Sequence, residues 1–185
     1  MIEITEDCIS KVEKILAGIP KGAERVFSNS INRGLSRVKT GATKQVKQVY
    51  TVQSSAFTSS ANIKIGKASV SNLAGYVSFS GCKIPLYKFK VTPKVPGTGK
   101  RVSATVMRGG GATFEDAFIA NMNHGTGVFV RETSKRFPVE ELMGLSSAQM
   151  VGNEKVLAEV EKEAQKLMDE RIEHEIDRLL NGYGG

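Results

Sequence analysis

The spacing of the apolar residues changes twice along this 185-residue chain, and these changes restrict the fold more than any other feature. Over residues 7–17 and 22–52, apolar side chains recur every three or four residues, as on one face of an α-helix. From residue 61 to 132 they alternate with polar ones, as in half-buried β-strands. The helical spacing returns over 146–181. This order predicts an α+β fold, in which an antiparallel sheet is packed by a long N-terminal helix and a long C-terminal helix.

The length is typical of one domain, so we expect residues 1–185 to form a single domain. Its predicted parts are a short N-terminal helix within 1–21, a long helix over 22–52, the antiparallel sheet over 61–132 and the C-terminal helix over 146–181. Ser146 and Gln149 have the spacing of a capping box at the start of that last helix. Residues 54–60 are predicted to be a polar break and residues 93–100 a loop.

The C-terminal helix has an apolar side that we expect to pack on the sheet. The predicted contact joins two sets of residues: Leu157, Val160, Ala164, Leu167, Ile172 and Ile176 on the helix, and Val77, Phe79 and Phe89 on the sheet.

Charge is unevenly distributed. Residues 25–114 include 15 Lys or Arg and no Asp or Glu, whereas residues 115–185 include 8 basic and 14 acidic residues, and the formal net charge is +7. A one-signed stretch of this length creates a strong field over the middle of the fold. Two interpretations carry equal weight. The stretch is a solubilising surface or a face for an acidic neighbour, or it contacts DNA phosphate.

Residues suited to catalysis or metal binding are sparse. The two cysteines, Cys8 and Cys82, and two histidines, His124 and His174, do not match the common zinc frameworks and argue against a disulfide scaffold. We expect two buried thiols, with a bridge between the two cysteines as the alternative, and a loop role for His124. The glycine run at 109–111 lacks the Lys and Ser/Thr of a phosphate loop. We therefore expect no catalytic, cofactor-binding or metal-binding residues, and a protein that is not an enzyme.

Membrane insertion is not expected either. No stretch approaches the ~20 apolar residues that a membrane span needs. The acidic N-terminus also lacks the apolar core of a secretory signal.

Several short segments together resemble the minor tail protein Z family of lambda-like phages and prophages. The most specific are residues 114–120 (FEDAFIA) and 125–131 (GTGVFVR), and they are accompanied by residues 30–35 (SINRGL), 84–89 (IPLYKF), 138–144 (PVEELMG) and 146–150 (SSAQM). The resemblance covers roughly residues 23–180. It implies a structural tail-completion protein at the head-proximal end of a non-contractile tail. Such a protein is needed for productive head–tail joining and for positioning the genome end. It would be located in the virion tail, and in the host cytoplasm during assembly.

The resemblance also implies partners. By analogy with other tail-completion and tail-terminator proteins, we expect a homo-oligomeric ring, for which a hexamer is one option. The ring would contact other tail or neck proteins such as the tail terminator, and the genomic DNA end. We expect no membrane partner and no small-molecule substrate. A stand-alone, sequence-nonspecific nucleic-acid-binding protein is the alternative function that the acid-free stretch leaves open.

Two sets of charged residues are the candidate interaction sites. Four of the cations on the polar side of the long helix are predicted to share a surface. This surface would face either the acidic C-terminal helix of the next subunit in a ring or the DNA channel, and the contact between subunits is the one favoured here. This predicted subunit interface consists of Arg33, Arg37, Lys44, Lys47, Glu159, Glu163 and Glu170. The predicted DNA- or lumen-facing residues are Lys64, Lys67, Lys94, Lys100 and Arg101.

Overall fold

The computed structural model describes residues 2–122 and 125–182 and divides the chain into two compact units. The first, which we call the helical unit, comprises Met1–Ala42, Ile63–Ser78 and Leu157–Gly185. The second, the strand-rich unit, comprises Thr43–Asn62 and Phe79–Val156. The mixture of long helices and antiparallel strands confirms the predicted α+β class.

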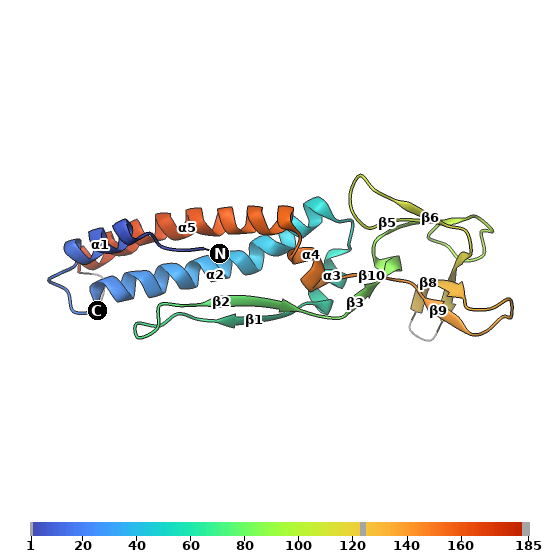
Figure 1. Cartoon of the computed structure of the whole chain (residues 1–185), viewed down its shortest axis with the longest axis horizontal. Coiled ribbons are helices and arrows are strands. Elements are labelled where there is room, and N and C mark those ends of the chain that lie inside the picture. The colour runs from blue at the N-terminus through green and yellow to red at the C-terminus, as the bar shows by residue number, and fades with distance from the viewer. Residues whose placement is uncertain (1, 123–124, 183–185) are drawn as a thin grey trace. The chain divides into compact units, whose positions relative to one another are not determined.

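Two long antiparallel helices form the centre of the helical unit (Figure 1). A shorter helix and a two-stranded hairpin complete it. The elements are α1 (Glu6–Ile15), α2 (Gly22–Val49), α5 (Glu154–Leu180), β1 (Asn62–Gly66) and β2 (Tyr76–Ser80). The last residues of α2 and the first of α5 belong to the strand-rich unit.

Local signals in the sequence explain where the helices begin. The Thr5 side chain accepts a hydrogen bond from the backbone N–H of Cys8 at 3.4 Å, which caps α1. The capping box of Ser146 and Gln149 is present as predicted and starts α4 (Ser147–Val151). The C-terminal helical stretch is interrupted after α4, at Gly152 and Asn153, before α5 begins.

Within the helical unit, every fourth residue of α5 is buried, and the face that these residues form packs on α2. It consists of Val160, Ala164, Met168 and Ile172, each at most 4% exposed. Ile172 belongs to a core cluster with residues of α1, α2 and the segment joining them: Val12, Leu16, Ala23, Val26 and Phe27.

The predicted packing face of α5 is therefore partly wrong. Leu157 is 41% exposed and Leu167 is only half-buried. Phe89 is buried within the strand-rich unit, where its ring lies against Gly144. The physical reason is that α2 offers α5 small residues. Gly34 lies opposite Ala164 and Met168, so the two helices approach closely along this line.

A methyl group added at Gly34 should stabilise the protein. A Cβ there would have its nearest neighbours, the Ala164 carbonyl oxygen and the Met168 Cβ, at 3.8 Å, which is ordinary van der Waals contact. Alanine also favours a helix interior over glycine by about 0.5–1 kcal/mol. We expect Gly34→Ala to raise the free energy of unfolding by that amount, measured by denaturant titration.

The matched control is Gly75→Ala in the hairpin loop. A Cβ at Gly75 would come within 2.6 Å of Leu35 Cδ1 and 2.9 Å of the Gly66 carbonyl oxygen. This variant should lose stability. A loss of stability in Gly34→Ala would contradict the 3.8 Å spacing between this position and α5.

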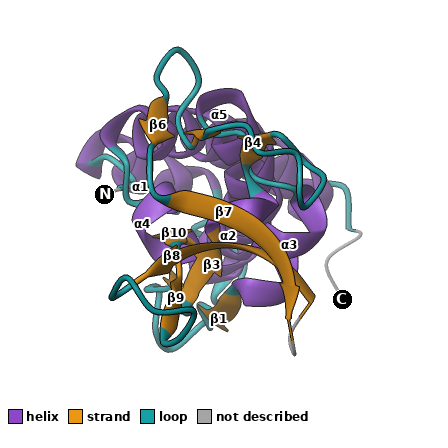
Figure 2. Cartoon of the chain, turned by 90° about the vertical axis from the view of Figure 1, so that its right-hand side faces the viewer, coloured by secondary structure: helices purple, strands orange, loops and turns teal. Residues whose placement is uncertain are grey.

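The strand-rich unit consists of short strands and short helices (Figure 2). Its elements, besides α4 and the helix ends, are α3 (Ser54–Ser60), β3 (Lys83–Pro85), η1 (Leu86–Lys88), β4 (Lys90–Thr92), β5 (Val102–Thr105), β6 (Ala112–Phe114), β7 (Ala117–Met122), β8 (Gly125–Arg131), β9 (Val139–Glu141) and β10 (Met143–Ser146). Residues 93–101, between β4 and β5, form a loop, as predicted for 93–100.

The described strands form four small sheets in place of the one sheet predicted over 61–132. Their strand orders are β1–β2, β10–β3, β4–β5–β6 and β7–β8–β9. The sequence also failed to predict β9, β10 and the short helix α3. Strands of three or four residues are too short to show an alternating pattern, and their pairing depends on partners distant in sequence, as β10 with β3 illustrates.

Candidate interaction surfaces

Net charge is confined to one of the two units. The helical unit has 13 basic and 13 acidic residues, whereas the strand-rich unit has 13 basic and 6 acidic residues. The whole formal charge of +7 therefore belongs to the strand-rich unit. In the helical unit, the cations of the acid-free stretch are balanced by α5 and by the N-terminal residues. This division favours the strand-rich unit as the place where a polyanion would be attracted.

The sheet β4–β5–β6 has a face made of hydroxyl and ammonium groups. Lys90 and Thr92 of β4 are exposed and alternate with a buried valine. The register places Thr105 opposite Lys90, Ser103 opposite Thr92, and Thr113 opposite Ser103. Directly opposite residues share one side of an antiparallel sheet, and we call this side the hydroxyl face. Hydroxyl groups and lysines are the usual ligands of nucleic-acid phosphates, which they hold without reading sequence.

The structure separates the five predicted DNA-facing residues into two groups. Lys94, Lys100 and Arg101 are exposed in the loop between β4 and β5, next to the hydroxyl face. Arg101 forms an exposed ion pair with Glu115 at 3.1 Å. Lys64 and Lys67 are also exposed but belong to the helical unit. Sequence reasoning missed Lys90 and its hydroxyl neighbours, although their alternation with apolar residues was a usable signal.

The predicted subunit-interface cations are all exposed on α2. They are Arg33, Arg37, Lys44 and Lys47, of which the last two fall in the strand-rich unit. The predicted acidic partners on α5 differ in their surroundings. Glu159 and Glu170 are exposed, and Glu170 lies 3.9 Å from Lys166, whereas Glu163 is half-buried.

One predicted intersubunit charge pair exists within a single chain. The guanidinium of Arg37 lies 3.1 Å from the Glu163 carboxylate. Because α2 and α5 pack together in the same chain, these two charges satisfy each other before any second copy is involved.

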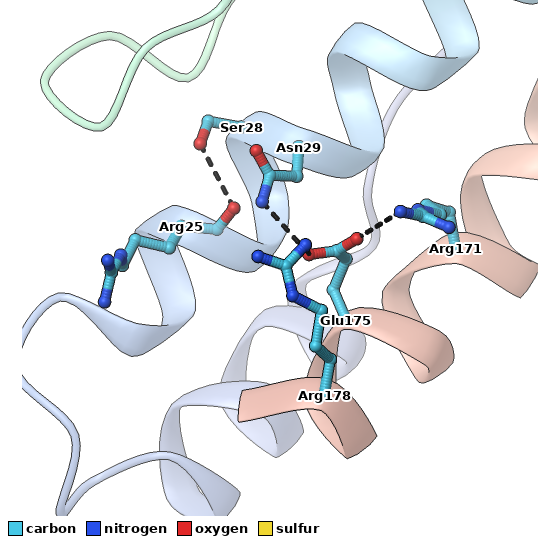
Figure 3. Close-up of polar contacts among 6 residues, drawn as sticks. All are labelled: Arg25, Ser28, Asn29, Arg171, Glu175 and Arg178. Carbon is cyan, nitrogen blue, oxygen red and sulfur yellow. Dashed lines mark hydrogen bonds and ion pairs between the residues drawn. The ribbon is translucent and has the colours of Figure 1, made fainter. Parts of the chain in front are cut away.

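A buried carboxylate connects α2 with α5 (Figure 3). Glu175 has a side chain that is only 3% exposed, and it lies 2.6 Å from Arg171 and 3.4 Å from Arg178, both on α5. The side-chain amide of Asn29 on α2 donates a hydrogen bond to the same carboxylate at 3.0 Å. A charge this deeply buried is tolerated only with such partners. The Asn29 hydrogen bond therefore links the two helices through a buried charge.

The helical unit also contains an open, largely apolar pocket of about 970 Å³. Side chains from α1, α2, α5 and the hairpin line it, among them Ile9, Phe27, Leu35 and Leu73. The charged residues of its lining are predominantly acidic: Glu3, Glu13, Glu24 and Glu161, with Lys21 as the single cation among the described lining residues. An apolar cavity with an acidic lining suits an occupant with an apolar tip and basic neighbours.

An exposed aromatic residue lies in the loop between β8 and β9, in the strand-rich unit. Phe137 is 60% exposed, and the guanidinium of Arg136 lies 5.6 Å from the centre of its ring. The loop is closed by a hydrogen bond from the Glu132 N–H to the Pro138 carbonyl at 3.3 Å. The sequence signal was present as the run Lys135, Arg136, Phe137, but it was not recognised as a candidate contact.

Comparison with known families identifies the group of proteins to which this chain is related. The family described as prophage minor tail protein Z (GPZ) matches residues 5–183. The chain belongs to this family. No curated protein and no solved structure matches it at a significant level.

Membership in a minor tail protein family makes the chain a structural component of a phage tail, located in the virion tail with other tail components as neighbours. It also confirms the family resemblance found in the sequence. No helix within residues 2–122 and 125–182 is long and apolar enough to cross a membrane.

Two of the segments that carry the family resemblance have a clear structural role. In segment 30–35, the Asn32 amide both donates to the Ala68 carbonyl and accepts from the Ala68 N–H, each at 2.9 Å, so it holds the β1–β2 loop against α2. In segment 138–144, Gly144 lies so close to Phe89 that a Cβ would come within 2.5 Å of the ring. Both segments therefore organise packing.

The residues considered for chemistry do not form a site in the described part of the chain. His124 lies outside the described residues, and His174 is exposed on α5. No group of three or more metal-ligating side chains gathers among the described residues. Both cysteines are free. Cys8 is half-buried and Cys82 is exposed, so the expectation of a buried Cys82 thiol was wrong.

Proposed function

We propose that this minor tail protein completes the head-proximal end of a non-contractile tail and is needed for productive joining to a filled head. The family assignment over residues 5–183 carries the proposal. One family profile spans both compact units, so we treat them as one tail-completion domain. Assembly would take place in the host cytoplasm, with the tail terminator among the neighbours. We assign the protein no catalytic activity.

We further propose that copies of the chain form a closed ring, for which a hexamer is one option. Ring contacts join two different surfaces of the subunit. The exposed cations Arg33, Lys44 and Lys47 on α2 and the exposed Glu159 and Glu170 on α5 remain the proposed charged contacts. Arg37 and Glu163 already pair within one chain, so we expect them to contribute less than the other residues to a contact between subunits.

The DNA-facing surface of the ring is proposed to be the strand-rich unit. Its +7 charge, its hydroxyl face and the exposed Lys94, Lys100 and Arg101 support this assignment. A cationic lumen would hold the genome end through phosphate contacts that are independent of sequence. Lys64 and Lys67, in the unit without net charge, are given no DNA contact in this proposal.

The alternative function is a stand-alone, nonspecific nucleic-acid-binding protein, and the charge of the strand-rich unit is the observation that favours it. Deleting the gene from an inducible prophage and imaging the lysate separates the two. The tail-completion role predicts filled heads and full-length tails that do not join into infectious particles, with recovery by the intact gene in trans. Normal titres from the deletion would contradict the proposal.

DNA binding by the strand-rich unit can be measured directly. We expect affinity for random-sequence duplex DNA to fall by roughly 10³–10⁵ between about 50 and 200 mM salt if 6–10 phosphates are contacted. Removing Lys90, Lys94 and Lys100 together by alanine substitution should lower the salt slope by about one for each lost contact. The matched control, Lys64→Ala with Lys67→Ala, should leave the slope unchanged. Equal effects of the two sets would contradict the assignment of DNA contact to the strand-rich unit.

A further inference from the structure

We propose that the loop carrying Phe137 of one copy inserts into the apolar pocket of the helical unit of the next copy. This inference rests on the proposed ring and names the contact that would build it. It commits the pocket to a second copy of this chain, because the chain itself supplies both complementary parts.

The pocket needs an occupant that covers apolar surface. Its lining is dominated by aliphatic and aromatic side chains, and several of them are exposed to solvent: Leu73 is 40%, Leu157 41% and Tyr76 62% exposed. Its volume of about 970 Å³ is large enough for an aromatic side chain together with its neighbours. Removing these side chains from water is the main favourable contribution to docking.

Charge selects the kind of occupant. The acidic lining residues Glu3, Glu13, Glu24 and Glu161 outnumber the single cation Lys21 among the described lining residues. An acidic loop would be repelled, whereas an apolar tip beside cations would be attracted.

The Phe137 loop has this chemistry. Phe137 follows two cations, Lys135 and Arg136, and its ring is 60% exposed. The hydrogen bond between Glu132 and Pro138 closes the base of the loop, so less conformational entropy is lost on docking. Phenylalanine and arginine are also both enriched in protein–protein interfaces relative to the rest of the surface.

The resulting contact joins two different surfaces, because the loop and the pocket share no residue. Each copy presents one loop and one pocket, so the association is head-to-tail and can close into a ring.

The experiment uses the 185-residue chain and two variants, each of which disrupts one of the two parts of the contact. Phe137→Ala removes the loop's aromatic tip, and Leu73→Lys places a charge in the pocket at a residue already 40% exposed. Analytical ultracentrifugation should show an oligomer for the wild type and at least roughly 30-fold weaker association for each variant alone. Circular dichroism and thermal unfolding should show that both variants stay folded. Val95→Ala, which truncates an apolar residue that is 64% exposed in another loop, is the matched control and should assemble normally.

Mixing the two variants gives the sharpest result. Phe137→Ala retains an intact pocket and Leu73→Lys retains an intact loop, so an equimolar mixture should form heterodimers that stop at two subunits. Wild-type oligomers that survive Phe137→Ala would overturn this inference and leave the proposed ring standing. If assembly is lost in Leu73→Lys but not in Phe137→Ala, the pocket has an occupant other than the Phe137 loop, and this inference is also overturned. A wild-type chain that stays monomeric would overturn both the ring and this contact.

Discussion

Replacing Ile172 with alanine should lower the free energy of unfolding by about 2–5 kcal/mol. Ile172 is 4% exposed and lies in the core cluster of the helical unit with Val12, Val26 and Phe27. Truncation removes three methyl or methylene groups and leaves a cavity that the two long helices can close only by moving. Denaturant titration followed by circular dichroism measures the change.

The matched control is Leu167→Ala on the same helix. Leu167 is half-buried and lies outside the buried face of α5 that packs on α2. Its truncation should therefore lower the free energy of unfolding by only about 1 kcal/mol. Equal losses in the two variants would show that α5 is rotated about its axis relative to the arrangement described above.

The second large effect is expected at Glu175. In Glu175→Ala, Arg171 and Arg178 lose their buried carboxylate partner and the Asn29 amide loses its acceptor. Breaking a buried ion pair usually costs about 3–5 kcal/mol. The two guanidinium groups are 33% and 41% exposed and can be rehydrated, so we expect a loss of stability of about 3 kcal/mol, near the lower end of that range.

Two further variants separate charge from shape at this position. Glu175→Gln retains an acceptor for Asn29 but removes the negative charge, and it should be less destabilising than Glu175→Ala. Glu173→Ala removes an exposed carboxylate from the same turn and should change stability by no more than about 0.5 kcal/mol. A neutral effect of Glu175→Ala would mean that the carboxylate is not buried between the helices.

The helices were largely predictable from the sequence, whereas the buried side of α5 was predicted only in part. Apolar spacing, the Thr5 cap and the capping box at Ser146 mark the elements well, because these signals are local. The choice between Leu167 and Met168 as the core residue of α5 depends on the small residue Gly34 on the other helix, which no local pattern reveals.

For the strands, the sequence predicted location better than pairing. Alternation predicted where β-structure occurs but not how it pairs, because β10 finds its partner β3 some sixty residues earlier in the chain. Short strands of three or four residues also carry too few alternating positions to be recognised.

The sequence showed where charged residues occur along the chain, but not which of them contact one another in the fold. The sequence revealed the acid-free stretch, yet only the fold shows that the charge of its cations is balanced in one unit and unbalanced in the other. It likewise predicted that α2 and α5 are electrostatic partners, but not that Arg37 and Glu163 meet within one chain. The apolar pocket consists of residues brought together by tertiary structure, so it was not predicted. The run Lys135, Arg136, Phe137 was visible in the sequence, but it was not recognised as a candidate contact.

The most direct test of the account is the position of this protein in purified phage particles. An epitope tag on the chain, in a prophage whose titre the tag does not reduce, allows gold-labelled antibody to mark the protein on virions and on unjoined tails under negative stain. We predict label at one end of each unjoined tail, the end that meets the head. Label along the whole tail or at the opposite end, or purified particles from which the protein is absent, would contradict it.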